Sequence, residues 1–278
     1  MKTKQVIGAA YTNVNCPICG GEGRHFHSHD GYEIDRCGDC GFIYTKEIPS
    51  TDWLKQYYSN QYSANVTDGA YNAKKTWGLK HWLLANFLSF LTPSRGGQTK
   101  KLLEIGCSQG VLLRQFKAKK DWHAVGVDYG GAAVNFACQQ GLDAHVSDVE
   151  SMHFEPATFD AVVALHVMEH VQNLDVFITE IHRVLKQGGY FFAVMPSMSH
   201  YKPKLAGASW KYWGPPGHLW YFTNHSLTLF LESNGFEVKH CSSLYHRAHV
   251  RILAREIDCC PTIIHTDGMP IFFSLELS

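Results

Sequence analysis

Beyond residue 100 the sequence alternates between short apolar runs and stretches with helical periodicity. The apolar runs predict β-strands at 101–105, 124–127, 159–165, 190–194 and 236–243, with a last strand at 271–277. The stretches between them predict helices at 110–119, 132–140, 174–186 and 226–233. Because the connection from one strand through a helix to the next parallel strand is right-handed, this order predicts an α/β domain with a parallel sheet.

The composition is that of a globular protein without an excess of either charge. The chain has 278 residues, 45% hydrophobic and 18% charged, and its 25 Lys and Arg balance 25 Asp and Glu. That length allows one sizeable core and a small additional module. A surface that binds nucleic acid needs an excess of cationic side chains, so the balance argues against such a partner. No apolar run reaches the roughly 20 residues of a membrane helix and no secretory signal is found, so we expect a cytoplasmic protein.

Four cysteines form two closely spaced pairs near the start of the sequence. Cys16 and Cys19 are separated by 17 residues from Cys37 and Cys40, and a glycine follows each pair. Two such knuckles can place four thiolates tetrahedrally around one Zn²⁺. Two disulfides are the alternative, but the other five cysteines are scattered and odd in number. A closed four-thiolate site has no open coordination position, so we expect a structural zinc.

These patterns divide the chain into three expected parts. A zinc ribbon is expected at 1–48 and a helical cap or linker at 49–95, which contains a predicted helix at 77–91. The α/β domain is expected at 96–278. A segment rich in Trp, Tyr, Pro and Gly interrupts this domain near 196–224 and has the character of a substrate lid, although its tryptophans could equally cover the edge of the sheet.

The first predicted strand of the α/β domain ends in the turn Glu104–Gly110, which leads directly into a helix. Ligands of open parallel sheets bind at this edge, where glycines let the backbone approach them. The turn lacks two of the three glycines of a dinucleotide fingerprint. It matches a nucleophile elbow with Ser108, Asp160 and His218, but the strands that should precede an elbow are missing. The run from His166 to His170 spells a zinc-peptidase motif, but it begins at a strand end instead of on a helix.

The order of motifs from residue 100 to 278 resembles that of class I S-adenosylmethionine-dependent methyltransferases. Glu104-x-Gly106-x-Ser108-x-Gly110 resembles their acidic glycine-rich first motif, with serine in place of the middle glycine. Asp128 ends the second strand, 147–149 resembles the adenine-binding turn, 159–171 the fourth-strand motif and 185–189 the turn before the fifth strand. The resemblance implies a Rossmann-like, mostly parallel seven-stranded sheet with helices on both faces.

The resemblance also implies how S-adenosylmethionine is held. Asp128 would accept hydrogen bonds from both ribose hydroxyls, and Asp148 would face the exocyclic amine of adenine. The other expected cofactor-binding residues lie at the ends of the same strands: Glu104, Gly106, Cys107, Ser108, Gly110, Tyr129, Val149, Leu165 and His166.

Transfer to a hydroxyl acceptor needs a general base near neutral pH, a task that suits histidine. His166 and His170 follow the fourth strand, and His218 lies in the aromatic insertion. We expect all three to face the methyl end of the cofactor, with His218 as the first candidate because binding residues concentrate on loops. Some quinone-pathway relatives bind a divalent cation near this turn through carboxylates, and the histidine at 166 leaves that metal undecided.

The stretch 218–223 and the later Asn234-Gly235-Phe236 are similar to methyltransferases of quinone, sugar and natural-product pathways. We therefore predict methylation, at oxygen, of a small molecule or of a glycan or natural-product intermediate, with a homodimer as a candidate assembly. The alternatives are an rRNA or tRNA methyltransferase with a zinc module and a non-catalytic zinc-ribbon interaction protein. Zero net charge argues against RNA, and the retained Asp128 argues against loss of catalysis.

Overall fold

The computed structural model describes residues 11–54, 57, 75–92, 97–149, 152–243 and 249–257. Its main element is a seven-stranded sheet in the order β12-β13-β10-β9-β6-β7-β8. These strands are β6 (Lys100–Ile105), β7 (Trp122–Asp128), β8 (Asp143–Val146), β9 (Phe159–Leu165), β10 (Leu185–Pro196), β12 (Phe236–Ser243) and β13 (His249–Glu256). The strands from β10 to β8 run parallel, and β13 runs antiparallel to β10 and β12. The predicted mostly parallel seven-stranded sheet is confirmed.

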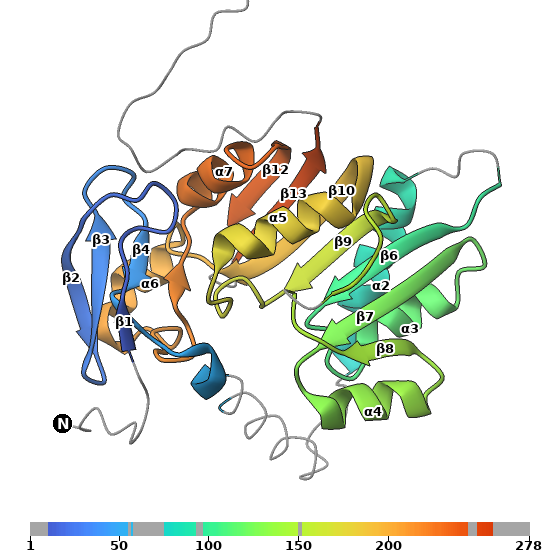
Figure 1. Ribbon diagram of the computed structural model, residues 1–278, viewed down its shortest axis with the longest axis horizontal. Helices are drawn as coiled ribbons and strands as arrows, with labels where there is room; N and C mark the ends of the chain where they lie inside the picture. Colours follow the sequence, from blue (N-terminus) through green and yellow to red (C-terminus); the bar gives the residue numbers. More distant parts are fainter. Residues whose placement is uncertain are drawn as a thin grey trace, which may run out of the picture.

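Helices cover both faces of this sheet (Figure 1). On one face, α5 (Leu174–Val184) and α7 (Asn224–Glu232) pack into an apolar layer. On the other face lie α2 (Lys75–Leu91), α3 (Val111–Lys117) and α4 (Gly131–Gln139). Neighbouring side chains of β6 divide between the two layers, because side chains of a strand alternate in direction. None of the helices in the described ranges is long and apolar enough to cross a membrane.

The cysteine-containing segment forms a second, smaller sheet that includes a strand of the α/β domain. In it β2 (Gly23–His29), β3 (Tyr32–Cys37) and β4 (Ile43–Thr45) are joined by β11 (Trp220–Tyr221), in the order β11-β4-β3-β2. A separate pair consists of β1 (Tyr11–Asn13) and β5 (Glu47–Pro49). Side chains of the ribbon and of the large sheet belong to one continuous apolar cluster. The ribbon therefore packs into the α/β domain, and the division at residues 48 and 95 stays a prediction.

The aromatic insertion contains α6 (Tyr201–Ala206), a short 3-10 helix (Gly207–Ser209) and β11. Trp210 and Trp213 are buried in a cluster with Ile34 and Ile43 of the ribbon. These two tryptophans therefore pack against the small sheet. The lid function expected of the whole segment stays a prediction.

The strand β13 was missed in the sequence, and the predicted strand at 271–277 lies outside the described residues. The middle of β13 is buried on both faces: Ile252 packs on the α5 side and Leu253 on the α2 side. Such a strand lacks the alternation of apolar and polar residues that marks an exposed sheet. The strand β10 begins at Leu185 instead of 190, because its pairing with β9 contains a register shift between Leu185 and Tyr190.

Candidate cofactor and histidine site

The turn between β6 and α3 depends on glycine at two positions. Gly106 and Gly110 both have a φ of 73°, which L side chains rarely adopt. A Cβ on Gly106 would lie 2.5 Å from Cγ2 of Val167, and one on Gly110 would lie 2.5 Å from Cδ1 of Leu142. Ser108 also has a positive φ, of 46°. The serine therefore keeps the left-handed conformation that a glycine at the middle position would adopt easily.

Asp128 ends β7 beside this turn and is 5% exposed. Its Oδ2 accepts a hydrogen bond from the backbone N–H of Ser108 at 2.8 Å, and its Oδ1 accepts one from Gly130 at 2.7 Å. Burial raises the pKa of Asp128, and the two amides oppose that shift. A carboxylate oxygen can accept more than one hydrogen bond, so both oxygens can also receive a ligand's hydroxyls.

Glu104 lies on β6 and is 4% exposed. Its Oε2 has no hydrogen-bond partner within the described part of the chain. Burial, and then the charge of Asp128, raise the pKa of Glu104 well above its usual value. A cation placed beside Glu104 would favour its charged form. The site therefore suits a ligand with a hydroxyl pair for one carboxylate and a positive charge for the other.

The other residues expected at the cofactor lie near the carboxyl ends of β6 to β9. Tyr129 is exposed, Val149 is buried, and Asp148 follows β8 by two residues. Leu165 ends β9 and His166 comes next. Cys107 is buried in an apolar cluster with residues of α3 and α4, so only its backbone is available to a ligand in the turn.

The three histidines proposed as bases lie together around buried Glu169. Nδ1 of His166 lies 3.2 Å from Oε1 of Glu169, and Nε2 of His170 lies 4.0 Å from the same oxygen. The rings of His170 and His218 are 4.7 Å apart. Burial opposes the charge on Glu169, but the hydrogen bond with His166 and the neighbouring histidines lower its pKa overall. The carboxylate of Glu169 therefore lies beside several imidazoles and can stabilise a positive charge on them.

Backbone carbonyls fix the orientation of two of these imidazoles. Nδ1 of His170 lies 2.8 Å from the carbonyl oxygen of Gly217, and Nδ1 of His218 lies 2.8 Å from that of Tyr212. A carbonyl oxygen can only accept, so each Nδ1 carries a proton and the neutral ring is basic at Nε2. Burial, and then nearby His170, lower the pKa of His218. His218 is therefore neutral near pH 7 and able to take up a proton.

Two members of this cluster, His249 and Glu169, were not among the site residues predicted from the sequence. The hydroxyl of Tyr212 lies 2.7 Å from Nε2 of His249, whose ring is 4.7 Å from that of His166. His249 begins β13, so it was missed together with that strand. Glu169 was visible only as part of the H-x-x-E-H spelling. Donor atoms of Glu169, His170 and His218 lie within 4.8 Å of one another, a spacing that could hold a metal ion, and a divalent cation at this turn stays undecided.

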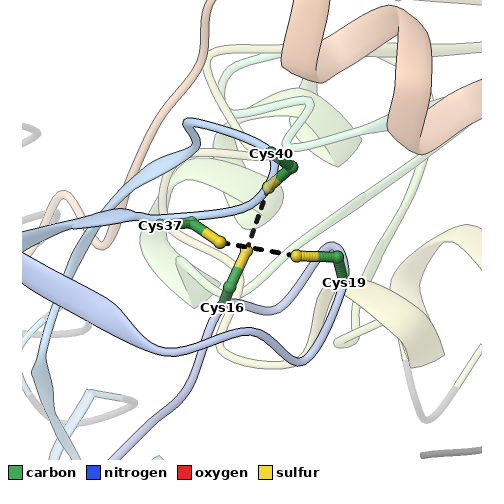
Figure 2. A group of neighbouring side chains, drawn as sticks. All are labelled: Cys16, Cys19, Cys37 and Cys40. Atoms are coloured by element: carbon green, nitrogen blue, oxygen red, sulfur yellow. Dashed lines mark hydrogen bonds between the residues drawn. The ribbon is translucent and has the colours of Figure 1, made fainter. Parts of the chain in front are cut away.

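The four ribbon cysteines direct their sulfur atoms toward one another (Figure 2). The Sγ atoms of Cys16 and Cys40 are 3.4 Å apart, as are those of Cys19 and Cys37, and all four lie within 4.8 Å. A disulfide needs a distance of about 2.0 Å. Four sulfurs at about 2.3 Å from one tetrahedral zinc would be separated by roughly 3.8 Å. The donor set and its spacing fit zinc and exclude disulfides between these cysteines.

The fold and this site together define a class of protein. The sheet is doubly wound, a glycine turn follows its first parallel strand, and a buried carboxylate ends the second. This combination is typical of the class I S-adenosylmethionine-dependent methyltransferases. The chain belongs to a family described as a methyltransferase domain, whose profile matches residues 79–240.

The chain is similar to two curated O-methyltransferases in sequence and to a solved methyltransferase in fold. A fatty-acid O-methyltransferase of Mycolicibacterium smegmatis is 33% identical over 100 residues, which are 33% of this chain and 35% of that protein. A ubiquinone biosynthesis O-methyltransferase of Hahella chejuensis is 30% identical over 112 residues, 38% and 47% of the two chains. The alignments thus span about a third to a half of these relatives. A methyltransferase solved in complex with the Trm112 activator of Haloferax volcanii has a TM-score of 0.55 at 15% identity, covering 70% of this chain and 97% of that one.

Proposed function

We propose that this chain transfers a methyl group from S-adenosylmethionine to an oxygen atom of a small molecule, such as a saccharide or natural-product intermediate. The observation that carries the proposal is a histidine cluster at the end of β9, on the same sheet edge as Asp128. The matched relatives named for ubiquinone and fatty-acid O-methylation support a small-molecule acceptor. A cytoplasmic location and a homodimer stay predictions.

The residues at the sheet edge fit the proposed cofactor. Asp128 would hold both ribose hydroxyls, and Asp148 would face the adenine amine. Glu104 would face the positively charged end of the ligand. That charge would give a partner to Oε2 of Glu104, which has none among the described residues. When bound, S-adenosylmethionine supplies a methyl group on a positively charged sulfur, which is already activated for transfer.

The histidine cluster would handle the proton of the acceptor. His218 is our first candidate for the base, acting through Nε2, and His166 and His170 are the other candidates. Glu169 would stabilise the imidazolium that forms, because its pKa is low and it lies beside the histidines. The aromatic insertion would exclude water from the acceptor.

A panel of acceptors tests this proposal. The zinc-containing chain would be incubated with S-adenosylmethionine and, separately, with phenols related to quinols, sugar nucleotides, fatty acids and tRNA, while release of S-adenosylhomocysteine is measured. We expect release with one small-molecule class, and a loss of about 10²-fold or more in His218→Asn. Release with tRNA alone would favour the RNA alternative. Absence of both release and cofactor binding would contradict the proposal.

A further inference from the structure

The ribbon and the methyltransferase domain meet at the residues that follow His218. The N–H of Leu219 donates to the carbonyl oxygen of Glu169 at 2.8 Å, and its own carbonyl oxygen accepts from the N–H of Thr45 at 2.8 Å. Leu219 is fully buried. One residue is thus bonded on one side to the histidine cluster and on the other to the ribbon.

The carbonyl oxygen of His218 is held by two hydroxyl groups. Oγ1 of Thr45 donates to it at 3.2 Å, and the hydroxyl of Tyr221 donates to it at 3.1 Å. Thr45 is 0% exposed and Tyr221 is 2% exposed, so water does not compete with either donor. The bond from Thr45 connects the backbone of His218 directly to β4, and the bond from Tyr221 connects it to β11.

The position of Thr45 follows from the cysteine site. Cys37 ends β3, and the turn that contains Cys40 returns the chain into β4, where Thr45 pairs with Ile34. The N–H of Cys37 donates to the carbonyl oxygen of Phe42 at 2.8 Å, which closes that turn. A metal bound by the four thiolates would therefore fix the start of β4. Thr45, at the end of β4, donates to the backbone of His218.

We propose that the ribbon is a positioning element of the histidine site and that Thr45 is the residue that transmits its position to His218. The inference rests on the proposed function, because it gives His218 its place beside the acceptor. A base acts only within hydrogen-bond reach of its proton, so a shift of about 1 Å in the backbone of His218 would reduce catalysis strongly.

Thr45 variants test the proposal, since the cofactor residues lie on other strands. Thr45→Val keeps the shape of the side chain and loses the hydroxyl, whereas Thr45→Ser keeps the hydroxyl and is the matched control. Tyr221→Phe removes the second donor, and the double variant removes both. Each protein would be tested for zinc content, for affinity to S-adenosylhomocysteine by calorimetry, and for the ¹⁵N NMR signals of the His218 ring, assigned with His218→Gln.

The wild-type His218 should show a protonated Nδ1 and an unprotonated Nε2. In Thr45→Val, and more in the double variant, we expect these signals to move or to broaden through exchange. Thr45→Ser should resemble the wild type. Zinc content should be unchanged, and the dissociation constant of S-adenosylhomocysteine should change by less than about twofold, because the sites are separate.

Two results would overturn the inference. One is an unchanged His218 spectrum in the double variant that still holds zinc. The other is a loss of affinity for S-adenosylhomocysteine in Thr45→Val or the double variant that accompanies the change in the His218 signals, because such a loss would indicate a general folding defect. Failure of the wild-type chain to bind S-adenosylhomocysteine would instead contradict the proposed function, while the NMR comparison would still decide the link from Thr45 to His218.

Discussion

Two buried carboxylates at the edge of the sheet differ in their partners. Asp128 accepts two backbone amides, whereas Oε2 of Glu104 has no partner among the residues described. Because burial raises the pKa of Glu104, the folded chain retains a proton that the unfolded chain releases near pH 4.3. The free energy of unfolding therefore falls as the pH rises from about 4.3 through the folded-state pKa.

We expect Glu104→Gln to remove this pH dependence. At pH 7 the variant should melt at a higher temperature than the wild type without ligand, because no charge has to be buried. It should also bind S-adenosylmethionine more weakly, because the counter-charge of the cation is lost. Thermal melts at pH 5 and pH 7, with and without ligand, measure both effects. A variant that is less stable at both pH values would contradict this account of Glu104.

The glycine turn offers a matched pair of substitutions. Gly106→Ala combines a positive φ with a Cβ 2.5 Å from Val167, so we expect it to lower the free energy of unfolding by at least about 1–2 kcal/mol. Gly78→Ala is the control, because a Cβ there meets nothing within 4 Å and a helical alanine stabilises by about 0.4–1 kcal/mol. Urea unfolding distinguishes them. Equal stability of the two variants would mean that the turn is not built as described.

Individual site residues differ in how far the sequence could predict them. The cysteine spacing predicted a tetrahedral sulfur group, and the three candidate histidines proved to be neighbours. The contacts of Glu169 and His249 could not be predicted, because they depend on how β9 and β13 are placed in the sheet. His249 has no local pattern that distinguishes it from an ordinary polar side chain, and the H-x-x-E-H pattern around Glu169 indicates a different kind of site.

At the scale of elements, α5 has a well-defined start. Oδ1 of Asn173 accepts hydrogen bonds from the backbone N–H groups of Asp175 and Val176, each at 3.1 Å. We expect Asn173→Ala to lower the free energy of unfolding by about 1 kcal/mol, and Asn173→Asp, which can also cap the helix, to lower it less. Denaturant titration checks this, and equal losses in both variants would argue against the cap.

The order of the α/β elements was predictable because strands and helices differ in the period of their apolar residues. The strand β11 was not predictable, since it has only two residues and pairs with a distant part of the chain. Trp220 pairs with Tyr44, which lies 176 residues earlier, and Tyr221 pairs with Ile43. Such a long-range pair leaves no periodic signal. It is nevertheless the strand by which the aromatic insertion pairs with the ribbon sheet.

For the whole molecule, we expect the ribbon and the α/β domain to unfold together, because their side chains share one apolar cluster. We expect about one zinc per chain by metal analysis. Cys19→Ser should lower that value and also lower the melting temperature of the whole chain in a single transition, because a structural zinc contributes folding energy. Two separate transitions would contradict a shared core, and a wild-type chain purified without chelators and lacking zinc would contradict the metal site.

We propose that Asp128 binds a nucleoside at the edge of the large sheet. Calorimetric titration of the folded, zinc-containing chain with S-adenosylmethionine measures this binding. We expect one binding site per chain, and Asp128→Ala should weaken binding by about 1–3 kcal/mol, because hydrogen bonds to a charged group are lost. Neither heat nor a thermal shift with S-adenosylmethionine or S-adenosylhomocysteine, or equal affinity in the Asp128 variant, would contradict it.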